Sequence, residues 1–135
     1  MTNNTITLTD RDKLTLRTAA YGAVSLLAAA GPKAHRVATD GCVALTSATG
    51  VVGHVLSQRR GAVPLGGKSV AALADRVLPA LTESMRLLAA QDPAEAENFR
   101  STIVIAVDAA RIHQDRPGPA ATEMARKITA ALDAA

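Results

Sequence analysis

The stretch VATDGCVALTSATGVVGHVLS, Val37 to Ser57, decides which fold class this sequence encodes. Its apolar and small residues recur at steps of four, three, four, four and three positions. That spacing places them on one face of a helix, whereas a strand would require strict alternation. The periodicity therefore predicts one helix over residues 33–57. The residues of this stripe are Val37, Gly41, Ala44, Ala48, Val52 and Val55.

Composition extends the helical prediction to the rest of the chain. Alanine is abundant, tryptophan is absent, and Tyr21 and Phe99 are the only aromatic residues. Helices pack well on alanine, leucine and valine, while sheets usually draw on aromatic and β-branched side chains. We therefore predict an all-α protein.

Start signals and apolar stripes divide the chain into about five helical segments. Thr9 with Asp12 predicts a helix N-cap, and Asp92 with Pro93 and Glu95 predicts a capping box at a later start. We expect a compact single-domain bundle over residues 1–135, with the second helix central and residues 1–8 forming a disordered or extended arm. The expected helices span residues 10–30, 33–57, 68–90 with a kink at Pro79, 93–113 and 119–133.

A second face of the 33–57 segment carries only small residues. Glycine inside a helix costs about 1 kcal/mol relative to alanine, so some interaction should offset its presence. Close approach of a neighbouring helix is the favoured explanation, and a ligand or a kink is the alternative. The small face makes this helix a candidate interface, formed by Thr46, Gly50, Gly53 and Ser57.

The loop GAVPLGGKS, Gly61 to Ser69, ends like the phosphate-binding loop of a nucleotide hydrolase. That motif needs glycine, four residues and then Gly-Lys-Ser, after a strand of a parallel sheet. Ala62 occupies the first position here, and the preceding segment has helical periodicity, so we discount a nucleotide site. A weaker anion site at the helix start remains, with a glycine-rich connection capped by serine as the favoured alternative. The anion-site candidates are Gly66, Gly67, Lys68 and Ser69.

Other chemistry finds little support in the sequence. His35, His54 and His113 lie on separate segments without metal-ligand spacing, so we expect no metal and no cofactor. We expect His54 to be a partly buried, hydrogen-bonded side chain and Cys42 to be a small buried one. The remaining carboxylates suit helix starts or surface charge rows, and no catalytic residue is assigned. These include Glu123 paired with Lys127, and Asp108 in a row with Arg111 and Asp115.

Charge and hydropathy restrict the partners. The net charge of +3 is modest, and no basic run alternates with aromatic residues, so we expect no nucleic acid. The segment TAAYGAVSLLAAAG is too short to span a bilayer, and Asp10 and Asp12 interrupt its resemblance to a secretory signal. We expect a cytoplasmic protein without membrane contact. The alanine, arginine and valine bias hints at a bacterial source.

These observations favour a non-enzymatic helical protein that acts through helix–helix contacts, as a homodimer or with another protein partner. The alternative is a small-molecule or anion-binding domain, with enzymatic activity left open, that uses the Gly66–Ser69 helix start.

Overall fold

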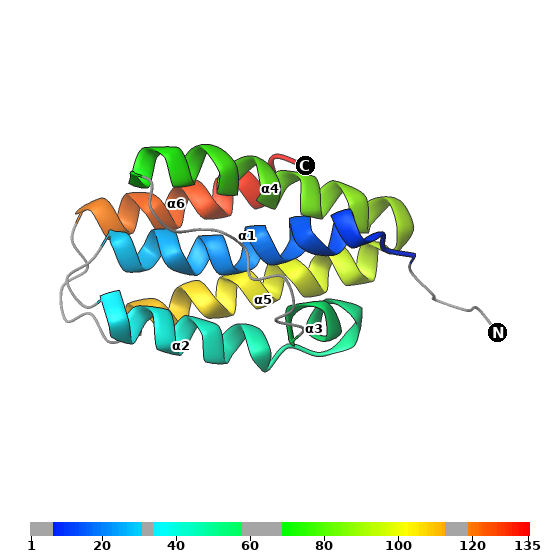
Figure 1. Ribbon diagram of the computed structural model, residues 1–135, viewed down its shortest axis with the longest axis horizontal. Helices are drawn as coiled ribbons and strands as arrows, with labels where there is room; N and C mark the ends of the chain where they lie inside the picture. Colours follow the sequence, from blue (N-terminus) through cyan, green and yellow to red (C-terminus); the bar gives the residue numbers. More distant parts are fainter. Residues whose placement is uncertain (1–6, 31–33, 58–68, 113–118) are drawn as a thin grey trace.

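The computed structural model describes residues 7–30, 34–57, 69–112 and 119–135, and these residues form an all-α bundle without strands (Figure 1). The predicted fold class is confirmed. Residues 1–6 of the arm expected over residues 1–8 lie outside the described residues, as do the candidate residues Gly66, Gly67 and Lys68. Of the arm's described residues, Thr7 is hydrogen-bonded to Gln91 and Leu8 packs against the core. The helices are α1 (Asp10–Ala29), α2 (Ala34–Thr46), α3 (Gly50–Ser57), α4 (Val70–Gln91), α5 (Pro93–Ile112) and α6 (Pro119–Asp133).

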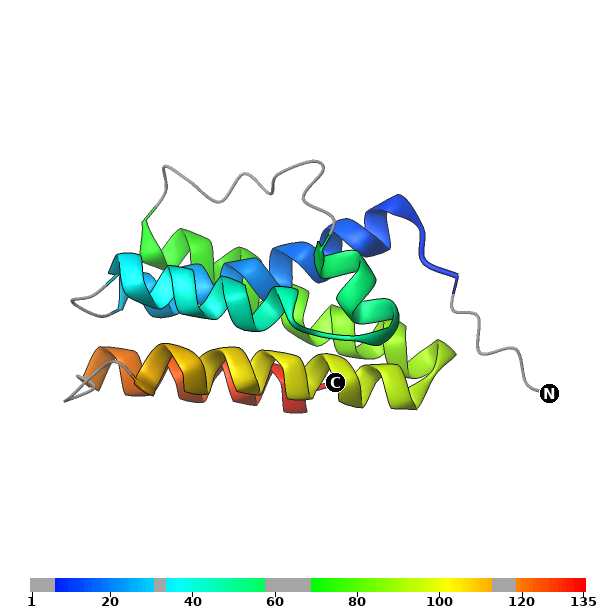
Figure 2. The ribbon, with the colours of Figure 1, turned by 90° about the horizontal axis from the view of Figure 1, so that it is seen from below.

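The centre of the bundle is α1 and not the segment predicted to be central. Helices α1, α2 and α4 form one layer, α5 and α6 form the other, and α1 lies over the space between α5 and α6 (Figures 1 and 2). Helix α1 packs against each of the other helices. Small side chains allow neighbours to approach α1 from several sides. Its buried residues are Leu16, Ala19, Ala20, Gly22, Ala23, Val24, Leu26, Leu27 and Ala28.

Predicted caps are found at two helix starts. Thr9 and Asp12 form a reciprocal capping box, with Thr9 Oγ1 accepting from Asp12 N at 3.0 Å and Asp12 Oδ2 accepting from Thr9 N at 3.1 Å. Asp92 Oδ1 accepts from Ala94 N at 3.0 Å at the start of α5. Both helix starts are therefore set by residues close to them in the sequence, as the sequence predicted.

The expected single helix over residues 33–57 is wrong, because the chain breaks it into α2 and α3. Helix α2 ends at Thr46, and α3 begins at Gly50, whose φ of +74° lies in the left-handed region. Ser47 Oγ donates to Val43 O at 2.8 Å, so its hydroxyl uses a carbonyl of the last turn of α2. Figure 1 shows α3 turned nearly end-on while α2 runs along the bundle.

Side chains of α5 hold the start of α3 in this orientation. Glu95 Oε1 accepts from Val52 N at 3.3 Å, and Asn98 Nδ2 donates to Thr49 O at 2.8 Å. A Cβ atom on Gly50 would lie 3.0 Å from Glu95 Oε2. The glycine therefore supplies both the left-handed conformation and the space for the α5 carboxylate. Glu95, expected to serve its own helix start, bonds to the amide of α3 instead.

Gly53 also serves the turn and not a neighbouring helix. A Cβ atom on this residue would overlap Ala48 O, so only glycine lets the backbone of the turn pass so close. The sequence favoured the close approach of a neighbouring helix as the reason for both glycines. The approaching groups are the chain's own turn at Ala48 and the α5 side chains at Gly50.

Helix α4 continues through Pro79 as a single helix from Val70 to Gln91. Pro79 is exposed, while Val77 and Leu81 on either side of it are fully buried. Proline removes one backbone donor and crowds the preceding turn. Burial of the apolar side chains on both sides of Pro79 offsets that cost.

We predict that Gly50→Ala lowers the free energy of unfolding by about 1–2 kcal/mol, because alanine is strained in the left-handed region. Gly53→Ala should cost more, since the obstructing atom is a backbone oxygen. Thr46→Ala, on the exposed surface of α2, should change stability by about 0.5 kcal/mol or less. Urea unfolding followed by circular dichroism measures all three, and a stabilising Gly50→Ala would contradict the proposed role of Gly50.

Candidate functional site

The residues proposed from the sequence as an interface do not share one helix face. Thr46 lies at the end of α2, whereas the other candidates lie on α3. Thr46 and Ser57 are exposed, and each hydroxyl donates to a backbone carbonyl of its own helix end. Gly50 faces Glu95 and Asn98 of α5, and Gly53 is buried. Contact of the exposed members with a second chain stays a prediction.

The proposed anion site is only partly described. Ser69 is the N-cap of α4, and its Oγ accepts from Ala72 N at 3.2 Å. The serine therefore performs the capping role that the sequence favoured over ligand binding. Anion binding at Gly66, Gly67, Lys68 and Ser69 stays a prediction.

Among the described residues, the side chains that could take part in catalysis or metal binding do not cluster. They contain no group of three His, Cys, Asp or Glu side chains that could hold a metal ion. His54 is exposed on α3, although the sequence suggested partial burial, and Cys42 is half-buried on α2. His113 lies outside the described ranges.

A shallow groove separates α5 from α6 on the outer side of their layer. It has a volume of about 380 Å³. Its floor is apolar, with Val107 and Ala125 buried and Val104 half-buried. On the α6 side, the lining residues other than Arg126 have small side chains. They therefore project only a short distance from the helix into the groove. The residues that line the groove are Val104, Val107, Asp108, Thr122, Ala125, Arg126 and Thr129.

An ion pair joins the two helices beside the groove. Arg100 Nε of α5 donates to Asp133 Oδ1 of α6 at 3.0 Å, and this contact raises the pKa of Arg100. The two helices run in opposite directions (Figure 1). Asp108 lies eight residues after Arg100, about 12 Å along α5, and Arg126 lies seven residues before Asp133, about 10 Å along α6. Asp108 and Arg126 therefore occupy the two walls of the groove at nearly the same height.

Arg126 is held in place on its own helix. Its Nε donates to Glu123 Oε1 at 3.0 Å, and its Nη2 donates to Glu123 Oε2. The hydrogen bond from Arg126 lowers the pKa of the Glu123 carboxyl, and the same bond raises the pKa of the guanidinium. The sequence paired Glu123 with Lys127, but the structure pairs it with Arg126. This geometry uses Nε and Nη2 and leaves the hydrogens of Nη1 directed elsewhere.

Exposed apolar side chains accompany the groove. Ile105, on α5, is 58% exposed, and Val43, on the neighbouring α2, is 59% exposed. Between Asp40 and His54 the sequence contains no acidic or basic residue, although Asp40 lies one turn before Val43 on α2. The outer surface of α2 and α5 thus exposes apolar side chains beside charged ones such as Asp108.

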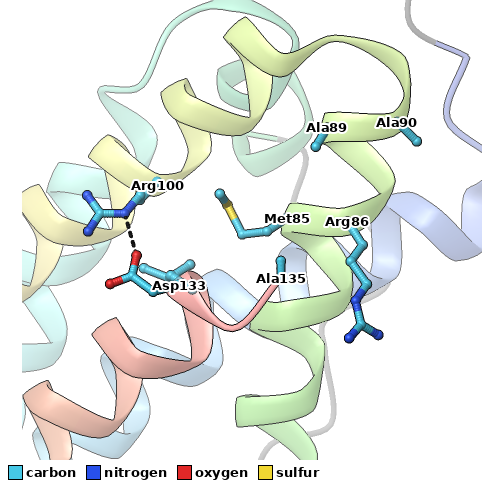
Figure 3. A pocket seen from close by; sticks show the side chains of 8 residues that line it. Met85, Arg86, Ala89, Ala90, Arg100, Asp133 and Ala135 are labelled. Atoms are coloured by element: carbon cyan, nitrogen blue, oxygen red, sulfur yellow. Dashed lines mark hydrogen bonds and ion pairs between the residues drawn. The ribbon is translucent and has the colours of Figure 1, made fainter.

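Two other cavities are less favourable candidates. One of about 550 Å³ lies at the Arg100–Asp133 pair, where Met85 extends from α4 toward α5 and α6 and Arg86 points away (Figure 3). The second, of about 340 Å³, lies between α3 and the segment that precedes α1. There Gln91 fixes the backbone of Thr7 through hydrogen bonds of 2.7 and 2.9 Å. In the first cavity the charges on α5 and α6 already neutralise each other as the Arg100–Asp133 pair, and the lining of the second contains no carboxylate.

The sequence missed the groove because its walls come from segments that no local signal connects. The stripe Phe99, Ile103, Val107 and Ala110 predicted the inner face of α5, but Asp108 appeared only as part of a surface charge row. The available signal was the series of small residues Thr122, Ala125 and Thr129, which indicates a narrow helix face.

Comparison with protein-family models, with curated proteins and with solved structures gives no match for this chain. Inference about its function therefore depends on the fold and the groove. No helix in the described part of the chain combines the length and apolar character needed to cross a bilayer.

We predict that the Glu123 carboxyl titrates below its ordinary pKa of 4.5 and that Arg126→Ala brings it back toward that value. Because the folded-state pKa is lowered, any stabilisation from this pair is present above the ordinary pKa and is lost as the pH falls through the folded-state value. Carboxyl chemical shifts measured by NMR across the acid range provide the test. An unchanged Glu123 titration in the variant would contradict the assigned cause.

Proposed function

We propose that this protein is a non-enzymatic helical module that acts through helix–helix contacts and associates with a second copy of itself. The observation that carries the proposal is the groove between α5 and α6, with its apolar floor and the 58% exposed Ile105 on the same helix. Protein interfaces place apolar side chains at the centre and polar groups at the rim. The groove follows this arrangement, because Val104 and Ala125 lie on its floor and Asp108 and Arg126 on its walls.

The contact surface proposed here differs from the small face suggested by the sequence. Gly53 is used inside the chain, so it has no surface to offer a partner. Helix α5, in contrast, presents Val104 and Ile105 at least partly to the outside. The surface of α2 around the exposed Val43 and Thr46 is a neighbouring second surface that the same experiments test.

We also propose a cytoplasmic location and a bacterial source. The segment that resembles a secretory signal forms α1, the helix against which all the others pack, so its removal would destroy the core. This supports its retention in the working protein. The bacterial assignment is supported by the composition alone.

We predict a solution mass near twice the 13.9 kDa of one chain, measured by multi-angle light scattering at micromolar concentration. Ile105→Glu should shift the mass toward one chain, because it places an unpaired charge in an apolar contact. Leu14→Glu is the matched control, since Leu14 is 43% exposed but lies on α1, and it should leave the mass unchanged. A wild-type mass of one chain would contradict self-association. Loss of association with Val43→Glu and not with Ile105→Glu would move the contact to α2.

A further inference from the structure

We infer that two copies of this chain meet groove to groove, with α5 of each copy lying along α6 of the other around a two-fold axis parallel to the groove. This inference rests on the proposed self-association and names its surface and partner. The occupant of the groove is then a second copy of the chain, and four helices form the contact.

Charge complementarity is the reason for choosing this partner and this axis. Asp108 and Arg126 lie on opposite walls of the groove at nearly the same height. Rotation by half a turn about the groove direction keeps that height and exchanges the walls. Asp108 of one copy then faces Arg126 of the other, and the same contact occurs twice. An axis across the groove would place α5 opposite α5 and α6 opposite α6, so that Asp108 would face Asp108 and Arg126 would face Arg126. The charge pattern therefore selects the parallel axis.

The local geometry of Arg126 suits such a contact. Glu123 binds the Nε and Nη2 side of the guanidinium, which fixes the orientation of the arginine. Nη1 remains directed away from that pair and can donate to a second carboxylate. Glu123 and the facing Asp108 would thus share one guanidinium, and each side of the contact would carry a three-residue charge network.

The apolar part of the contact follows from the same rotation. Val104 and Val107 of one copy face the α6 side of the other groove, where Ala125 and Thr129 leave room for them. Ile105 follows Val104 on α5 but projects about 100° further around the helix and does not line the groove, so it lies at the rim of the contact. Small residues on one helix opposite larger apolar ones on the other allow close helix packing.

Charge reversal tests this arrangement. Asp108→Arg and Arg126→Asp should each raise the dimer dissociation constant about tenfold or more, since each replaces two attractive contacts by repulsive ones. Mixing the two variant chains should restore association, because in the mixed dimer opposite charges face each other on both sides. Asp75→Arg is the control, because it makes the same change in net charge on an exposed position of α4. Sedimentation velocity of the single variants, of the mixture and of the control measures these dissociation constants.

The outcomes separate this inference from the proposed function. A monomeric wild-type chain overturns both. A dimeric wild type whose association survives both reversals overturns the groove-to-groove arrangement and leaves self-association in place. Reversals that lower the unfolding temperature of each chain, without recovery of association on mixing, also overturn it, because they would place the Asp108–Arg126 interaction within one chain.

Discussion

The burial of α1 over most of its circumference is the constraint on which the rest of this structure depends. Its alanine, valine and leucine side chains point in several directions, so the helix is stable only if neighbours cover most of it, while the side that carries Leu14 stays exposed. The other helices do so in two layers, with α2 and α4 beside α1 and α5 and α6 beneath it. Alanine at positions such as Ala19, Ala20 and Ala23 lets these neighbours come close. The positions of α5 and α6, and so the groove between them, follow from this arrangement.

The helices that cover α1 pack their inner faces against it, so their outer faces are less completely packed. Helices α5 and α6 use their inner faces on the core, where Phe99, Ile103 and Ile128 are fully or almost fully buried. Between them on the outside, Val104 and Thr129 are only half-buried. A chain with this amount of alanine has few large side chains with which to close such a space. The groove is thus a consequence of the small-residue composition that also makes the central helix accessible to its neighbours.

Local signals predicted the parts of the fold that depend on residues close in sequence. The caps at Thr9 and at Asp92 satisfy backbone donors within a few residues, so their effect is visible without a structure. The break at Gly50 could not be predicted in this way, because the apolar periodicity continues through it. The stabilising bond joins Glu95 to Val52 N, and these two residues are 43 positions apart in the sequence. The same limit applies to the groove. The residues of the α5 wall and the small residues of α6 each form a pattern in the sequence. Nothing in the sequence shows that these two helix faces lie opposite each other.

Helix α5 links the two features that the sequence left undetermined. One side of α5 reaches α3 through Glu95 and Asn98, while Val104, Val107 and Asp108, further along the same helix, line the groove. A helix held at its first turns by hydrogen bonds to another element has fewer ways to slide or rotate along its axis. The α3 contacts therefore help to fix the height of Asp108 relative to Arg126. Since the pairing of a second copy depends on that height, the glycine-containing turn contributes to the contact surface through α5, although its own glycines are enclosed within the chain.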